Sequence, residues 1–311
     1  MAYIATTYVN PDTDGVAGCV ALRELSRELG FRERLTVILD GTINSETHAL
    51  FALAGLELPS IGMAALPQGV IAVALVDTHH LSQLPTWVAP ALVKVIFDHH
   101  SHGDTNFFPA ATIVNEKVGA ACTLIAERYF EAGSQISPAT ATALQGGILS
   151  NTLDFVAPST TERDRAAFAR LDEMTGRGAE LRQVLREERA AFINGTTSDI
   201  LSSDVKVFRD STTTIGMSQV EAPGASLIIQ RDDFWESYDR ESARLGLDIL
   251  VVNLADLTAS MSVIAVSDRR WQQRLNLEYR LVFDGGLAWT SELFLRKSHL
   301  VPLLTHKDDG R

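Results

Sequence analysis

The first half of the chain alternates short apolar runs with helical patterns. Four runs are rich in β-branched residues and span 3–9, 35–41, 70–77 and 91–98, and the last three end at Asp or Gly. Runs that are apolar along their whole length are typical of strands buried on both faces, as in a parallel sheet. The helical patterns span 15–29, 118–133 and 137–153. This alternation predicts an α/β domain with a doubly wound, mainly parallel sheet.

The second half of the chain has charged helical patterns and a different set of apolar runs. One helix is expected to open near 159–164, where Ser159 with Glu162 and Thr161 with Asp164 have capping spacing. Further charged helices are predicted at 179–193 and 231–245. Strand-like runs span 204–210, 213–220, 226–230, 248–254 and 261–267. The mixture predicts a smaller α/β domain with a mixed sheet.

A chain of 311 residues is too long for one ordinary core, so two domains are expected. The stretch "NGTTSD" at 194–199 has the composition of a turn or linker. We therefore predict a first domain over 1–193 and a second over 200–311.

Charge and composition exclude some classes of function. The 27 Lys and Arg residues against 39 Asp and Glu residues leave a net charge of −12, which argues against a nucleic-acid partner. The two cysteines are far apart and indicate no disulfide framework. Without a signal-peptide pattern or an apolar run of membrane length, we expect a cytoplasmic protein with no membrane partner.

Acidic and imidazole side chains follow the predicted strands. Asp12 and Asp14 come after the first run, Asp77 ends the third, and the fourth ends in Asp98, His99 and His100. The carboxyl ends of parallel strands share one edge of a sheet, so these side chains are expected to converge. Converging carboxylates repel one another unless some are protonated or a cation binds.

The residue types indicate which cation this would be. Histidine nitrogen beside carboxylate oxygen suits Mn, Fe, Co or Zn better than Ca. A carboxylate shared by two ions suits activation of water against phosphorus. Taken singly, an Asp at a strand end is more often a helix cap or turn residue, and a pair of histidines is more often structural. The ordered set on successive strand ends favours a metal site.

The motifs resemble one family over nearly the whole chain. "NPDTDG" (10–15), "LVD" (75–77), "FDHHS" (97–101) and "SNTLDFVAPSTTERD" (150–164) resemble the DHH phosphoesterases. The order is most similar to that of the family II manganese-dependent inorganic pyrophosphatases, which carry a second, DHHA2-type domain. "LRKSHLVPLL" (295–304) resembles the Arg-Lys substrate-binding motif of that domain.

The resemblance implies a role for each matching residue. Asp12 would bind one metal ion and Asp14 the other, Asp77 would bridge them, and His99 would bind the second ion. Asp98 would orient a ligand imidazole, and His100 would face the substrate or leaving group. Arg296 and Lys297 would bind phosphate oxygens. The implied cofactor is Mn or Mg, as one or two divalent ions per chain.

Two ligand positions depart from the family pattern. Tyr8 stands where the family has a metal-binding His, and Asn151 stands where it has the last metal-binding Asp, so Asn151 could offer only a neutral oxygen. A family lysine expected near 194–195 is not found there. His79 or His80 could fill the gap left at Tyr8, and Asp154 could lend its charge to the site.

The leading interpretation is a metal-dependent phosphohydrolase of pyrophosphate or of a related small phosphoanhydride or phosphoester. The altered ligands leave open a catalytically weak or inactive homologue that binds a phosphate-containing ligand or a partner. A nuclease-like function is disfavoured by the acidic net charge. The resemblance also implies a possible homodimer.

Overall fold

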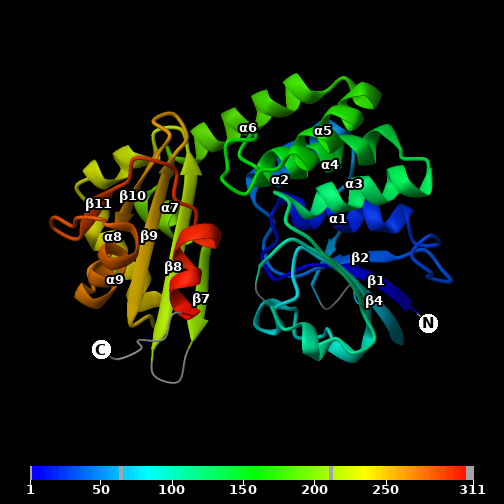
Figure 1. The fold of residues 1–311 in the computed structure, drawn as a ribbon, viewed down its shortest axis with the longest axis horizontal. Coiled ribbons are helices and arrows are strands. Elements are labelled where there is room, and N and C mark those ends of the chain that lie inside the picture. The colour runs from blue at the N-terminus through cyan, green and yellow to red at the C-terminus, as the bar shows by residue number, and fades with distance from the viewer. Residues whose placement is uncertain (1, 63–65, 67, 102, 210–212, 306–311) are drawn as a thin grey trace. The chain divides into compact units, whose positions relative to one another are not determined.

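The computed structural model describes residues 2–62, 66, 68–101, 103–209 and 213–305. The chain divides into two compact units, Met1–Leu185 and Arg186–Arg311 (Figure 1). Helix α6 (Gly178–Phe192) contains the point of division, and α7 (Thr197–Ser202) begins within the stretch predicted as a linker. The domain boundary at 194–199 therefore stays a prediction.

In the described part of the first unit, six strands form one sheet in the order β3-β2-β1-β4-β5-β6, and every pairing is parallel. The strands are β1 (Ala2–Thr6), β2 (Thr36–Leu39), β3 (Ser60–Ile61), β4 (Val70–Val76), β5 (Val93–Asp98) and β6 (Thr112–Asn115). The order reverses between β1 and β4, which are neighbours although β2 and β3 lie between them in sequence. Doubly wound sheets form a crevice at such a reversal.

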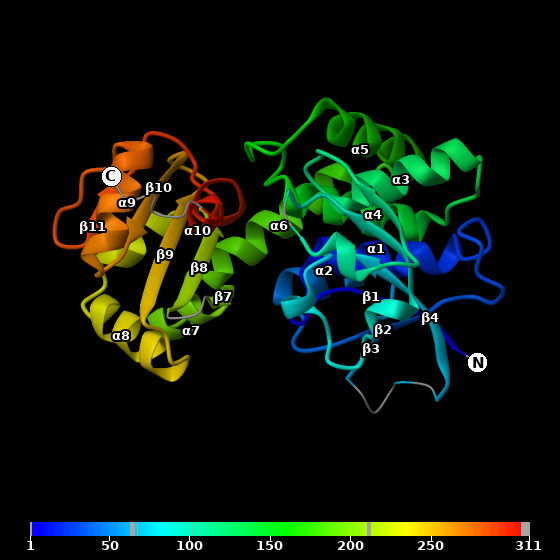
Figure 2. The same cartoon turned by 60° about the horizontal axis from the view of Figure 1, so that its bottom comes forward.

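Helices cover one face of this sheet (Figures 1 and 2). They are α1 (Thr13–Glu24), α2 (Ser45–Ala54), α3 (Ala121–Ala132), α4 (Pro138–Asn151) and α5 (Glu162–Thr175). The larger core joins apolar side chains of α1, α3 and α4 to Ala5, Ala74 and Phe97 of the strands. A smaller core on Val73, Leu75 and other residues joins the sheet to the segments after β4 and β5.

The second unit has a mixed sheet. Among its described residues, five strands lie in the order β11-β10-β9-β8-β7, where β8 and β9 are parallel and the other pairs antiparallel. The strands are β7 (Val205–Arg209), β8 (Thr214–Ala222), β9 (Ile249–Asp256), β10 (Met261–Ala265) and β11 (Leu287–Trp289). The helices of eight or more residues are α8 (Phe234–Arg244) and α9 (Arg269–Tyr279). The short helix α10 (Pro302–Thr305) follows near the end of the described chain.

The predicted fold class is confirmed for both units. The capping spacing at Thr161 and Asp164 is realised at the start of α5, where both side chains hydrogen-bond as a capping box. The strand predicted at 226–230 is wrong, because Ala225–Gln230 form a 3₁₀ helix. Asp256 accepts from the backbone of Gly224 and Ser226 and so stabilises that turn. Asp210, the last residue of the run predicted at 204–210, lies outside the described residues.

Candidate metal centre

The predicted site residues of the first unit gather where the strand order reverses. Asp12 and Asp14 follow β1, Asp77 follows β4, and Asp98 ends β5. Asn10 and Asp77 both have a φ of 58°, in the left-handed region that non-glycine residues rarely adopt. Such a conformation costs about 1–2 kcal/mol per residue and is common where a binding site constrains the backbone.

Asp77, His99 and His100 form the centre of this site. Each offers one potential ligand atom, and these atoms lie within 4.8 Å of one another. His99 Nδ1 donates to the Val118 carbonyl at 2.8 Å, so the lone pair of its ring is on Nε2. That nitrogen lies 3.1 Å from Asp77 Oδ1. A nitrogen lone pair facing a carboxylate oxygen needs a proton or a cation between them, so this donor set fits one divalent ion.

Asp14 is fully buried at the start of α1. Its carboxylate accepts from the backbone nitrogens of Ala121 and Cys122, at 2.7 and 2.8 Å, in the first turn of α3. Burial, followed by the negative charge of Asp77, raises the pKa of Asp14 to about 7. Asp14 Oδ2 is 3.8 Å from His99 Nε2, so the structure brings this predicted ligand close to the centre.

Asn151 is the last residue of α4, and its side chain turns toward Asp14. Its Nδ2 lies 2.9 Å from Asp14 Oδ2, 3.1 Å from the Gly119 carbonyl and 3.0 Å from His99 Nε2. Gly147, one turn earlier, permits this approach, because a Cβ there would lie 2.5 Å from Cys122 Sγ and 3.3 Å from Asp14 Cα. The amide nitrogen presents N–H hydrogens at a position where a metal ligand would present a lone pair, so this part of the site does not fit an ion.

Asp98 connects two imidazole rings. Its Oδ1 accepts from His100 Nδ1 at 2.6 Å, and its Oδ2 binds His79 Nδ1. Burial opposes ionisation of Asp98, but the charge and hydrogen bonds of His100, with the hydrogen bond from His79, hold its pKa well below the usual range. This geometry suits the orienting role predicted for Asp98.

The substitute ligands considered from the sequence lie in different surroundings. His79 is held on Asp98, and the ring of His80 stacks on it with centroids 5.6 Å apart. Asp154 forms an ion pair with Arg182 at 2.7 Å, so its charge is directed to that partner. The sequence did not show the pairings of His79 with Asp98 and of Asp154 with Arg182, because those partners become neighbours only on folding.

Tyr8 lies beside Asp12. The Tyr8 hydroxyl accepts the backbone N–H of Asp12 at 3.2 Å, and the Tyr8 side chain is buried. The Asp12 carboxylate accepts from Gly15 N at 3.1 Å and so caps α1. Tyr8 thus lies two residues before the "NPDTDG" loop, and its place as a substitute for a metal-binding histidine stays a prediction.

The basic motif of the second unit lies in a different environment. Arg296 is buried and donates to both carboxylate oxygens of Asp204 at 2.9 and 2.8 Å. It also donates to the carbonyls of Asp204 and Met217, at 2.8 and 3.1 Å. Lys297 follows it and is half-buried. Lys206 on β7 pairs in register with Met217, so a lysine that the sequence reading did not single out has its backbone near Arg296.

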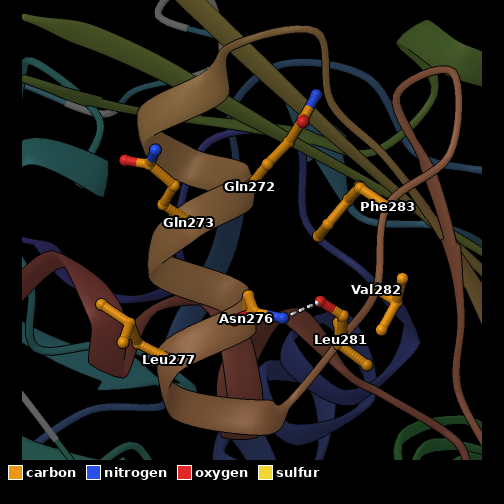
Figure 3. Close-up of a pocket in the computed structure, with 7 residues that line it drawn as sticks. All are labelled: Gln272, Gln273, Asn276, Leu277, Leu281, Val282 and Phe283. Carbon is orange, nitrogen blue, oxygen red and sulfur yellow. Dashed lines mark hydrogen bonds between the residues drawn. The ribbon is translucent and has the colours of Figure 1, made fainter.

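A pocket in the second unit lies between α9 and the segment after it (Figure 3). Its walls are amide and apolar side chains, among them Gln272, Asn276, Leu281 and Phe283. None of its lining residues is acidic, basic or a histidine. This pocket therefore lacks the residue types needed for phosphate chemistry.

Two protein-family descriptions match the chain. The DHH family, N-terminal domain, matches residues 3–148, and the DHHA2 domain matches 183–306. The chain is therefore similar to the DHH family in its first half and to the DHHA2 domain in its second half. The resemblance stated from its motifs is thereby confirmed, and the order of the two domains agrees with the two folds described above.

Named relatives match this chain over almost all its length. A manganese-dependent inorganic pyrophosphatase of Methanothrix thermoacetophila is 28% identical, covering 95% of this chain and 94% of the relative. A Staphylococcus saprophyticus protein named as a probable manganese-dependent inorganic pyrophosphatase is 29% identical, with coverage of 97% and 98%.

A solved structure shares the fold. The crystal structure of a Methanococcus jannaschii protein assigned to the family II inorganic pyrophosphatases superposes with a TM-score of 0.82. It is 23% identical and covers 97% of this chain and 98% of its own. Within the described residues, we find no helix with the length and apolarity needed to cross a membrane.

Proposed function

We propose that this chain is a divalent-metal-dependent phosphohydrolase that acts on pyrophosphate or on a related small phosphoanhydride or phosphoester. The observation that carries the proposal is the approach of His99 Nε2 to Asp77 Oδ1 at 3.1 Å, with His100 beside them. The names of the relatives support Mn²⁺ or Mg²⁺ as the ion and a small phosphate compound as the substrate.

The first-unit residues have distinct roles in this proposal. Asp77 and His99 hold the ion, and the Val118 carbonyl keeps the His99 ring in the required tautomer. When bound, a divalent ion supplies Lewis acidity and positive charge opposite the phosphoryl oxygens. Asp98 holds the Nδ1 proton of His100, so Nε2 is the atom at which His100 exchanges a proton with a phosphate oxygen or leaving group.

The roles predicted for Arg296 and Lys297 as phosphate-binding residues belong to the same proposal. The internal pairing of Arg296 sets a condition on its role. A phosphate group that is to receive the Arg296 donors must displace the carboxylate of Asp204.

A second candidate function is binding of a phosphate compound without turnover. Two observations favour it: the amide donor of Asn151 at the metal centre, and the engagement of Arg296 by Asp204. The retained Asp77, Asp98, His99 and His100 favour hydrolysis, because a scaffold needs none of them.

A phosphate-release screen distinguishes the two candidates. Pyrophosphate, tripolyphosphate and nucleotides are each tested with Mn²⁺, Mg²⁺ and Co²⁺, with Asp77→Asn purified in parallel to expose contaminating enzymes. Release by the native chain and not by the variant supports hydrolysis. Absence of release from all substrates, together with calorimetric binding of pyrophosphate, supports the second candidate. The cytoplasmic location, the absence of a nucleic-acid partner and the homodimer stay predictions.

A further inference from the structure

The Asp14 carboxylate has most of its hydrogen-bonding capacity used by the protein. Oδ2 accepts from Ala121 N and Asn151 Nδ2, at 2.7 and 2.9 Å, and Oδ1 accepts from Cys122 N at 2.8 Å. A carboxylate oxygen has about two lone-pair positions, so Oδ2 is saturated. The first turn of α3 also places the positive end of the helix dipole at this carboxylate.

The amide nitrogen of Asn151 carries two hydrogens. It donates to Asp14 Oδ2 at 2.9 Å and to the Gly119 carbonyl at 3.1 Å. His99 Nε2 lies 3.0 Å from the same nitrogen and 3.1 Å from Asp77 Oδ1, where its lone pair is needed for the ion. The opposite orientation of the amide would direct its oxygen at Asp14 Oδ2 and the Gly119 carbonyl and leave both without this donor. Buried acceptors that lose their donor are costly, so the surroundings select the amide hydrogens.

We infer that the Asn151 amide takes the place of one of the two divalent ions that the family resemblance implies. It joins Asp14 to the end of α4 with N–H donors, where a shared ion would otherwise join two carboxylates. The chain then holds at most one divalent ion, at Asp77 and His99. The inference rests on the proposed function only for the divalent nature of the ion.

The residues at the positions that the resemblance assigns to the ion of Asp12 also agree with at most one ion. The Tyr8 hydroxyl accepts the Asp12 N–H, and a phenol with a pKa near 10 is a weak ligand at neutral pH. Asp12 itself caps α1. Tyr8 and Asn151, the two departures from the family pattern, therefore both weaken the binding of a second ion.

Asn151→Asp tests the inference through stability. An Asp at 151 has no hydrogen to donate, so two buried carboxylates, the Gly119 carbonyl and His99 Nε2 would face one another. We expect the variant, prepared with Mn²⁺ and then treated with EDTA, to have a Tm lower than that of the native chain by roughly 10 °C. In excess Mn²⁺, the difference in Tm between the variant and the native chain should become much smaller. Asn194→Asp adds the same charge at an exposed position, and its Tm should equal that of the native chain both in EDTA and in excess Mn²⁺.

Equilibrium dialysis of the native chain with Mn²⁺ gives the second readout, and at most one ion per chain is expected. Two ions per chain at similar affinity would overturn the inference, as would an Asn151→Asp variant as stable in EDTA as the native chain. If Asn151→Asp does not fold, Asn151→Ala replaces it. That variant should be less stable than the native chain by the same margin in EDTA and in excess Mn²⁺, because Ala adds no ligand. A margin that Mn²⁺ closes would contradict the inference. Neither measurement uses turnover, so failure of the inference and failure of the proposed hydrolysis are separate results.

Discussion

The metal centre of the first unit and the basic motif of the second differ in the charges that face each other. Around Asp77 and His99, a nitrogen lone pair and a carboxylate oxygen face each other at 3.1 Å. Around Arg296, a guanidinium cation donates to a carboxylate and two carbonyls, all within 3.1 Å. The first arrangement gains stability when a cation arrives, whereas the second already has its counter-charge.

This difference separates a site that recruits a ligand from one that must exchange a partner. A cation added at Asp77 and His99 relieves the repulsion between a nitrogen lone pair and a carboxylate oxygen, which favours its binding. An anion at Arg296 replaces Asp204, so only the difference between the two ion pairs contributes to affinity. The Asn151–Asp14 contact resembles the Arg296 site, because the Asn151 amide already gives the Asp14 carboxylate a donor within the protein.

The largest expected effect is at Asp77. Asp77→Asn removes the negative charge while keeping a residue that tolerates the left-handed backbone at φ 58°. Bound metal and phosphate release should fall together, each by about 100-fold or more. Metal content by mass spectrometry and phosphate release measure this, with exposed Glu131→Gln as the control. Retained metal with full turnover would show that Asp77 is not a ligand.

The next effect is at Arg296. If Arg296 exchanges Asp204 for phosphate, Arg296→Ala should weaken substrate binding or turnover by about 2–4 kcal/mol while metal binding to the first unit is unchanged. Arg270→Ala on the exposed face of α9 is the control. Calorimetry with Mn²⁺ and with pyrophosphate separates the two affinities. Loss of metal binding in proportion to activity would assign Arg296 a structural role.

The pH dependence of stability tests the electrostatics around Arg296. Withdrawal from water raises the pKa of Glu221 from 4.5 to about 7; Arg189 opposes this shift and Asp204 adds to it. The folded chain therefore holds a proton that the unfolded chain releases, so stability falls as the pH rises from about 4.5 to about 7. Glu221→Gln should make this fall less steep in urea denaturation at pH 5 and pH 7.5. An unchanged difference in the free energy of unfolding between pH 5 and pH 7.5 would exclude Glu221 as a source of the pH dependence.

The smallest effect is expected at Asp204. Asp204→Asn weakens the internal competitor of the phosphate, so affinity for pyrophosphate should rise by roughly 5-fold, the scale of a partly exposed ion pair. Asp232→Asn removes the same charge at an exposed residue of the second unit and serves as the control. Equal affinities of Asp204→Asn and the native chain would show that phosphate does not compete with Asp204.

Local patterns predicted much of the fold. The strands β1, β2, β4 and β5 were expected from short apolar runs, and the mixed sheet of the second unit from its own set of runs. Such features depend on residues close together in sequence, because periodicity and capping act over a few positions. The 3₁₀ helix at Ala225–Gln230 was missed because its stabilising carboxylate, Asp256, lies 30 residues from Ser226.

The site divides in the same way. The order of acids and histidines in the chain was enough to predict a metal-binding edge of a parallel sheet, because strand ends that share a direction share an edge. Which of these groups receives a hydrogen bond depends on contacts across the fold. Asn151 meets Asp14 across 137 positions, and Arg296 meets Asp204 across 92. Sequence identifies Asn151 as an amide, but the direction of its N–H groups is set by Asp14 Oδ2 and the Gly119 carbonyl, which only folding brings to the end of α4.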